Sequence, residues 1–381
     1  MKLFKQLLVA PAAIGLLAPL SASASEVDFD AISNYSNNDL EIDVNSFNQK
    51  SIKNDLLSGG EGLVDSSETI GGFSETTTAS FGVDFLIGAA DGSTDTEATT
   101  FSYQMGIGLE TSFTGEDSLS ATIDIGDAAG PIGTGNSTSN YDGLNFDSTE
   151  NKLQLDGLTY TFPLGGATVM VGDQTDVSAL YTGACAYSAF TDYMGNCGTG
   201  GSVGVGGNGV TATIGYAFDS GFSLAGGLSS SPTGIVTNDS DTYGIEAAYT
   251  ADSYGVALAY VSADGGEDPE TTSWGLNASY TPESTSLPSI SVGYETEETG
   301  GTDASGYFVG LTWSEVGPGS LSVGGGTTQN FASGATETLT YEASYSYAIN
   351  DGMTITPGVF ITEVDGGDDL TGVAVLTSFS F

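Results

Sequence analysis

The chain has 381 residues, 56 of them glycine, and it carries 49 acidic side chains against five lysines, with no arginine and no histidine. The net charge of −44 excludes a basic surface for nucleic acid or anionic lipid. Without histidine, Ser–His and Cys–His nucleophile pairs are impossible, so we predict no enzymatic activity, no metal site and no cofactor.

The N-terminus has the order of features found in export signals. Lys2 and Lys5 precede an apolar segment from Leu7 to Leu20, and Ala22–Ala24 offers the small residues of a cleavage site. We therefore predict a secretory signal peptide over residues 1–24. Three lysines and 49 acids remain after cleavage, which gives a mature net charge of −46 (3 minus 49).

Residues 25–75 are polar and acidic, with clusters of asparagine and serine. Segments of this composition bury too little apolar surface to fold alone. We expect a flexible periplasmic lead-in here. A short contact element toward the cell wall or neighbouring subunits is the alternative.

From Ser80 to the C-terminus, apolar side chains recur at every second position within a series of short runs. Successive side chains of a strand point to opposite faces, so each such run gives one apolar face and one face of small and polar residues. A change of parity near Gly157 predicts a β-bulge. The alternating runs, in chain order, are 81–87, 101–109, 119–125, 153–162, 167–171, 210–218, 222–228, 243–249, 254–260, 274–280, 290–294, 307–313, 321–323, 339–347, 353–361 and 370–381.

Aromatic residues mark both ends of many apolar faces, as at Tyr243 and Tyr249 or Tyr254 and Tyr260. Two rings of aromatic residues, one at each membrane interface, are typical of outer-membrane barrels, and so are connections that alternate between short turns and long acidic loops. We predict an all-β fold over residues 76–381: a transmembrane antiparallel β-barrel of about 16 strands with both termini in the periplasm.

The longest connection, residues 173–208, follows the fifth run. Connections of this length without secondary structure are usually functional. It contains the only cysteines, Cys185 and Cys197, and paired cysteines of exported proteins usually form a bridge. We predict a disulfide between them, which would limit the disorder of the loop.

Several short runs resemble a known family. The final strand, which ends on Phe381, resembles the C-terminal signature recognised by the barrel-assembly machinery. Residues 1–13 (MKLFKQLLVAPAA), 76–85 (TTTASFGVDF) and 158–165 (LTYTFPLG) look like cyanobacterial outer-membrane porins, which are similar to the carbohydrate-selective porin family. Two features depart from that pattern: residues 25–75 are too short for an S-layer-homology domain, and no arginine is present to line an eyelet.

The resemblance implies that the connection between strands 5 and 6 folds inward and narrows the pore. A loop that stays outside the barrel with a solvated acidic face is the alternative. The residues that would give the inward loop an anionic, aromatic surface are Asp173, Asp176, Asp192, Tyr181, Tyr187 and Tyr193.

The expected function is passive diffusion of small hydrophilic solutes and inorganic ions, including sugars, with a preference for cations because carboxylates dominate the charge. The expected form is a homotrimer in the outer membrane, in contact with its lipids and lipopolysaccharide. The alternative is a surface barrel or adhesin without a channel, whose acidic loops loosely bind Ca²⁺ or Mg²⁺.

Overall fold

The computed structural model describes residues 77–92, 99–127, 149, 151–194, 197, 209–231, 241–264, 269–328 and 331–381. The predicted signal peptide and lead-in lie outside these ranges.

The described residues form one sheet of 17 strands, of which β14 has two residues, leaving 16 long strands (17 minus 1). The strands are β1 (Thr77–Asp91), β2 (Thr100–Thr111), β3 (Ser118–Gly126), β4 (Gln154–Leu164), β5 (Ala167–Thr175), β6 (Gly209–Ala217), β7 (Phe222–Ser230), β8 (Asp241–Thr250), β9 (Tyr254–Ala263), β10 (Thr271–Tyr280), β11 (Ser289–Thr299), β12 (Thr302–Val316), β13 (Gly319–Thr327), β14 (Phe331–Ala332), β15 (Leu339–Asn350), β16 (Met353–Thr362) and β17 (Leu370–Ser380).

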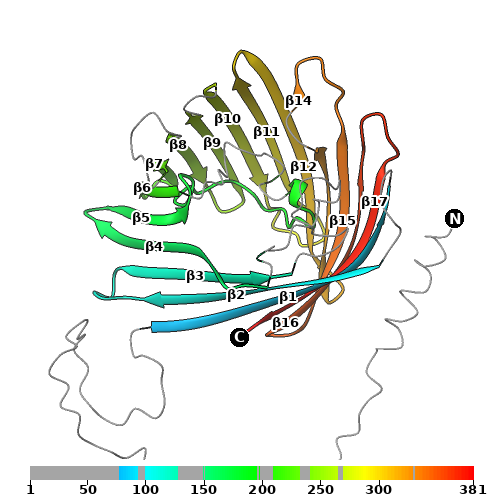
Figure 1. The fold of residues 1–381 in the computed structure, drawn as a ribbon, viewed down its shortest axis with the longest axis horizontal. Coiled ribbons are helices and arrows are strands. Elements are labelled where there is room, and N and C mark those ends of the chain that lie inside the picture. Colours follow the sequence, from blue (N-terminus) through cyan, green and yellow to red (C-terminus); the bar gives the residue numbers. More distant parts are fainter. Residues whose placement is uncertain are drawn as a thin grey trace, which may run out of the picture. The chain divides into compact units, whose positions relative to one another are not determined.

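The sheet closes on itself, because β1 pairs antiparallel with both β2 and β17. Figure 1 shows the blue first strand beside the red last one. At this seam the Phe81 and Phe381 backbones exchange hydrogen bonds of 2.9 and 3.0 Å, and their rings stack with centroids 5.6 Å apart. A closed ring has no unpaired edge. The predicted antiparallel barrel is thereby confirmed.

The alternation of each strand sorts its side chains between two faces, as β8 and β9 illustrate. Ile245 is 56% exposed on the outer face, whereas the next residue, Glu246, is 1% exposed on the inner one. Leu258 is 45% exposed between two nearly inaccessible alanines, Ala257 and Ala259. Large apolar side chains therefore face outward, which is the reverse of a water-soluble core.

The connections alternate as predicted. Tight turns join β4 to β5, β12 to β13 and β15 to β16 at the end of the barrel that also holds Thr77 and Phe381. The connections at the other end are longer, with two departures from this pattern. Gly300 and Gly301, with φ of 58° and 82°, join β11 to β12 directly, and residues 281–288 make a longer connection from β10 to β11 at the end with the tight turns. Among the described residues, the one helix, η3 (Asp192–Met194), has three residues, and no helix is suited to cross a membrane.

The parity change in β4 is a bulge, as predicted. Thr122 of β3 pairs with Gly157, and the next residue, Ile123, pairs with Leu155, so the ladder skips Asp156. The extra residue restores Leu158 to the outer face, where it is 41% exposed.

The turn between β2 and β3 is organised by one carboxylate. Asp117 is 7% exposed, and its Oδ1 accepts hydrogen bonds from the Ser112 hydroxyl (2.9 Å), the Phe113 amide (3.0 Å), and the amide (2.7 Å) and hydroxyl (2.8 Å) of Thr114. Its Oδ2 accepts one from the Tyr160 hydroxyl at 2.7 Å. These donors, the Tyr160 hydroxyl first among them, hold the pKa of Asp117 well below its ordinary value against the opposing effect of burial.

Replacing Asp117 by asparagine is expected to lower the thermal stability of the barrel at neutral pH. A carboxyl with a lowered folded-state pKa stabilises the fold fully above its unfolded pKa, and that stabilisation is lost as pH falls toward the folded-state pKa. The difference in melting temperature between wild type and Asp117→Asn should therefore be constant above about pH 5 and shrink below about pH 4. Circular-dichroism melts in detergent measure it. Asp252→Asn, at the exposed β8–β9 turn, is the control, and a difference that persists unchanged in acid would contradict the assignment.

Candidate functional site

Residues 176–194, the described first part of the connection after β5, lie inside the barrel, where Figure 1 shows them in green across the interior. Their contacts advance along the inner wall as residue numbers rise. In order they are Leu180 beside Gly215 of β6, Thr182 hydrogen-bonded to Ser223 of β7, Ala186 to Ser291 of β11, Ser188 to Thr312 of β12, and Phe190 against Gly358 of β16. All the strand partners share the parity opposite to the exposed apolar residues. The loop therefore narrows the lumen from the side of β6–β16.

A buried glutamate of β8 holds the first part of this loop. Glu246 Oε1 accepts the Thr182 amide at 2.6 Å and Oε2 accepts the Gly183 amide at 3.1 Å. Hydrogen bonds to a charged acceptor contribute about 1.5–3 kcal/mol each. They also satisfy two amides that would otherwise be without partners against the wall.

A second buried glutamate, Glu342 of β15, holds the tip of the loop. Its Oε1 accepts the Tyr187 hydroxyl (2.6 Å) and the Phe190 amide (2.8 Å). Its Oε2 accepts the amide (2.8 Å) and hydroxyl (2.5 Å) of Thr191. Burial, followed by the nearby Glu342 carboxylate, raises the pKa of Tyr187 well above its ordinary value. The phenol therefore stays protonated and keeps donating.

Glycines of the wall receive the aromatic side chains of the loop. A Cβ built on Gly310 would lie 2.4 Å from the Tyr187 ring, and one on Gly324 would lie 2.4 Å from its hydroxyl. A Cβ on Gly358 would meet the Phe190 ring at 2.5 Å. These separations are far below contact distance, so the absence of side chains at these glycines is what lets the rings approach the strands this closely.

The Gly358→Ala change is expected to displace Phe190 and loosen the tip of the loop without breaking the barrel. The ring lies in a cluster with Phe360, Leu86 and Leu370, so its expulsion should cost roughly 2 kcal/mol of docking free energy. Limited proteolysis of the folded protein checks this, with faster cleavage within 176–194 as the expected result. The matched control is Gly215→Ala, whose Cβ would meet Leu180 at an ordinary 3.5 Å. If the two variants are cleaved at equal rates, the space left by Gly358 is not needed to hold the Phe190 ring.

The loop is closed covalently as well. Cys185 and Cys197 are bonded, with Cα atoms 6.1 Å apart. The bridge links Cys185, which follows the residues bound by Glu246, to Cys197, which follows η3. Met194 and Cys197 pack with Phe308 of β12, so the C-terminal end of the bridged segment lies against the wall.

The six residues predicted for the constriction do not gather at one place in the structure. Asp173 is in β5 and shares the parity of the outward-facing Val171, and Asp176 Oδ1 caps a turn through the amide and hydroxyl of Ser178. Asp192 is exposed at the start of η3. Tyr187 is turned to the wall by its contact with Glu342, and the Tyr181 hydroxyl is buried. The side chain of Tyr193 lies outside the described residues.

Sequence reasoning missed the acidic surface of β1–β4. Asp84 of β1 accepts a hydrogen bond from Gln104 of β2 at 3.0 Å, and Asp124 of β3 lies 3.2 Å from the Cβ position of Gly106 on the same inner face. Asp156, at the bulge of β4, accepts the Thr122 hydroxyl at 3.4 Å. The sequence did contain a signal for this surface. These acids alternate with the outward apolar residues of their strands, which places them on the inner face.

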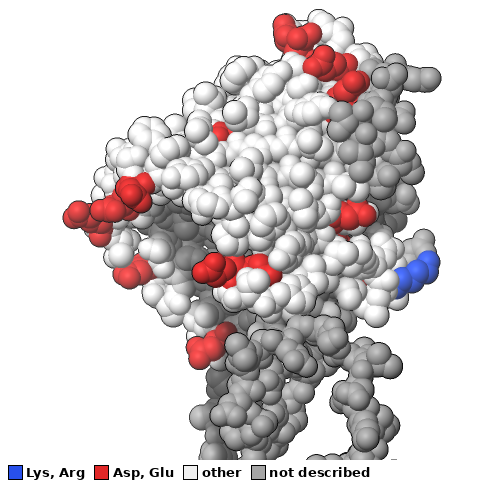
Figure 2. Space-filling model, turned by 90° about the vertical axis from the view of Figure 1, so that its left-hand side faces the viewer, with Lys and Arg blue, Asp and Glu red and all other residues white. Residues whose placement is uncertain are grey.

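Positive charge is nearly absent beside this surface. Lys152 is the one cationic side chain among the described residues, and it is exposed just before β4. Figure 2 shows acidic residues in separate groups with wide uncharged areas between them. In the described part of the chain, no group of three or more acidic or cysteine side chains is arranged to hold a metal ion.

Comparison with known proteins gives structural relatives only. No family model matches the sequence, and none of the curated proteins matches it. Pseudomonas putida OprB has a TM-score of 0.65 at 12% identity, covering 80% of this chain and 94% of that one. An OmpT loop-deletion mutant, an outer-membrane protein of Vibrio cholerae, has a TM-score of 0.57 at 11% identity, covering 81% of this chain and 100% of that one.

A triple mutant of Rh. blastica porin has a TM-score of 0.53 at 16% identity, covering 80% of this chain and 100% of that one. These identities are too low to transfer a substrate or a residue role. Together with the closed antiparallel ring, they show that the described residues of this chain adopt the fold of outer-membrane porins.

Proposed function

We propose that the protein is an outer-membrane porin through which small hydrophilic solutes and inorganic ions diffuse passively. The observation that carries this proposal is a closed barrel with an apolar outer face and a loop fixed against one side of its inner wall. A side-chain-filled barrel would need no such loop. Apart from Leu86 and Ala90 of β1, which share a cluster with Phe190 at the tip, the loop leaves β1–β4 to line the route for water and ions.

The route is proposed to prefer cations. Asp84, Asp124 and Asp156 face the lumen from β1, β3 and β4. Carboxylates in a channel with low-dielectric walls raise the local concentration of cations and lower that of anions. Sugars remain within the proposed solute range, since hydroxyl-rich Ser and Thr side chains alternate along the inner face.

The proposed setting follows from the same barrel. Long connections would face outward from the cell and both ends of the barrel chain inward. The signal peptide would deliver the chain, the Phe381 strand would engage the assembly machinery, and a trimer in contact with lipopolysaccharide would be the assembled form. Incorporation of the purified protein into a planar bilayer tests the proposed function: discrete conductance steps support it, and a folded protein that inserts without conducting supports the non-channel surface barrel.

A further inference from the structure

The disulfide of the inward loop has one exposed end and one buried end. Cys185 is the exposed end. Its neighbours on both sides are held by the wall: Ala184 packs on alanines of β8 and β9, and the Ala186 amide donates to the Ser291 hydroxyl at 2.8 Å. The Cys185 side chain, between them, therefore presents its exposed surface to the lumen.

The other end of the bridge is enclosed. Cys197 is 2% exposed and packs with Met194 and Phe308, and the Tyr187 ring lies 5.3 Å from the Phe308 ring. The φ of Cys197 is 55°, in the left-handed region that residues other than glycine rarely adopt. The bridge and these contacts together hold this backbone conformation, so breaking the bridge favours its relaxation.

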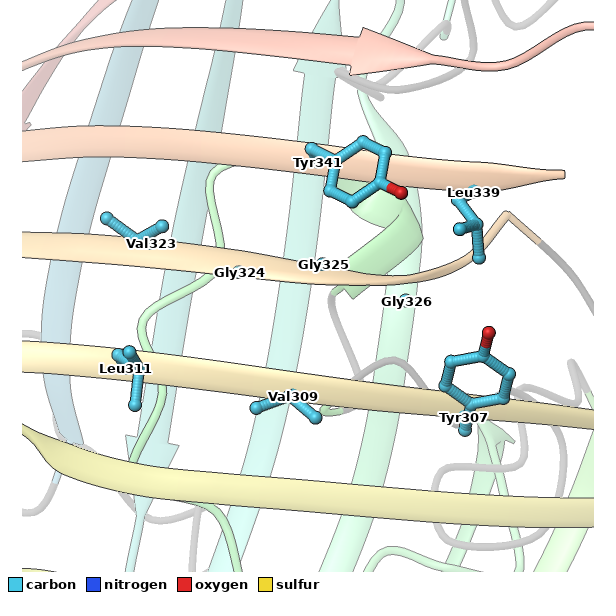
Figure 3. Close-up of a pocket in the computed structure, with 9 residues that line it drawn as sticks. All are labelled: Tyr307, Val309, Leu311, Val323, Gly324, Gly325, Gly326, Leu339 and Tyr341. Carbon is cyan, nitrogen blue, oxygen red and sulfur yellow. The ribbon is translucent and has the colours of Figure 1, made fainter.

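The wall behind the bridged segment gives no second route to the sulfurs. β12, β13 and β15 pair with one another behind the Tyr187 ring, and Figure 3 shows their outer face, where Val309, Leu311 and Val323 point away from the lumen. A polar reagent crosses neither hydrocarbon nor a paired sheet. The bridge is therefore approached through the lumen, at Cys185.

We propose that this bridge is a redox-sensitive latch of the loop, opened by a small dithiol that attacks Cys185 from the lumen. The inference rests on the proposed function, since the dithiol arrives through the pore. The bridged segment of 13 residues (12 plus 1) contains all three residues bound by Glu342, which are Tyr187, Phe190 and Thr191. Opening the bridge therefore loosens the part of the loop that narrows the lumen.

The exchange has two balanced steps. One thiolate of the dithiol attacks the Cys185 sulfur, the bond to Cys197 breaks, and its electron pair leaves on the Cys197 sulfur, which takes a proton from water. The second thiol of the reagent then attacks the reagent sulfur of the mixed disulfide and releases Cys185, which is protonated in turn. The dithiol loses two electrons and two protons and becomes a cyclic disulfide, and the bridge becomes two thiols.

A monothiol is expected to leave the latch closed. It can form the mixed disulfide at Cys185 but has no second thiol with which to complete the exchange. The apolar surroundings of Cys197 disfavour the thiolate formed there, so the first step is readily reversed. The adduct is therefore short-lived, and it lies on Cys185.

Two dithiols of different size test the route of attack. The purified barrel in mild detergent is treated with dithiothreitol, or with active thioredoxin, a protein dithiol too large for the lumen. Exchange is stopped with acid, the protein is unfolded, and its free thiols are labelled with maleimide and counted by mass spectrometry. Dithiothreitol should free both cysteines and thioredoxin neither. Equal reduction by the two, or no reduction by dithiothreitol, would overturn the proposal.

The same procedure with glutathione locates the attacked sulfur. Acid-quenched peptides should carry glutathione on Cys185 and maleimide on Cys197. Glutathione on Cys197 would show that the buried sulfur is the one attacked, which contradicts the proposal.

Conductance and proteolysis test the consequence for the loop. Opening a ring of this length should increase the time that wild type spends in larger-conductance states roughly a hundredfold, and an oxidant should restore the original trace. Proteolysis within residues 176–194 should become faster after reduction. The double variant Cys185→Ser, Cys197→Ser should behave like the reduced protein and ignore dithiothreitol, and the wild-type measurements stand if this variant does not fold.

The outcomes separate the latch from the channel. Two free thiols with unchanged current and unchanged proteolysis would refute the latch and leave the channel intact. Two free thiols with faster proteolysis in a barrel that carries no current would support the latch and refute the proposed function.

Discussion

Replacing Glu342 by alanine should release the tip of the loop from the wall and raise the single-channel conductance. The carboxylate accepts four hydrogen bonds from Tyr187, Phe190 and Thr191, and its removal also leaves two buried amides without an acceptor. Each bond to a charged group contributes about 1.5–3 kcal/mol, so the loss is expected to exceed about 4 kcal/mol. That shifts the ratio of docked to released loop by roughly a thousandfold.

The conductance of Glu342→Ala should be larger than that of wild type and noisier, because a released tip moves within the lumen. Glu342→Gln keeps one acceptor oxygen and should lie between the two. The control is Glu363→Ala, which removes a carboxylate whose described hydrogen bond is to the Leu339 amide rather than to the loop. If Glu342→Ala conducts like the control, the loop does not limit the flow of ions.

Neutralising the acidic wall should reduce the preference for cations. In the triple variant Asp84→Asn, Asp124→Asn and Asp156→Asn, each lost charge removes about 0.5 kcal/mol of attraction for a cation some 8 Å away in water. With partial screening at about 0.1 M salt, the three together should lower the cation-to-anion permeability ratio roughly fivefold. Reversal potentials across a salt gradient measure this ratio.

The salt dependence makes the same prediction stricter. The effect should nearly vanish at about 1 M salt, where charges are screened within about 3 Å. The control variant changes Glu297, Glu298 and Asp303 to their amides at the β11–β12 hairpin, which removes the same number of charges at the rim. An unchanged reversal potential in the wall variant, or an equal change in the rim variant, would contradict the role of the wall.

The strands were predictable because their signal is local. Each run of alternating residues carries its own period, and the closed ring follows when all runs have the same apolar face. The bulge at Asp156 was equally local, since an extra residue shifts the parity of everything after Gly157. The two-residue β14 gave no such signal, because a period cannot be read from two positions.

The course of the loop could not be derived from its own residues. The sequence pointed to Tyr187 as part of an aromatic inner surface of the loop, but not to what the ring contacts. Only the register of distant strands brings Gly310, Gly324 and Gly358 beneath Tyr187 and Phe190. For the same reason, the sequence suggested that the acids of the loop would define the lumen. The acids of β1–β4 are the ones that face it together, and that grouping depends on strand pairing rather than on proximity along the chain.

The central claim is that the barrel encloses water along β1–β4. Single-channel recording of the purified wild-type protein in a planar bilayer tests it most directly. Discrete ohmic steps are expected, with a reversal potential that reports cation preference at low salt and little preference at about 1 M. A protein that inserts as a heat-modifiable folded barrel and carries no current would contradict the claim.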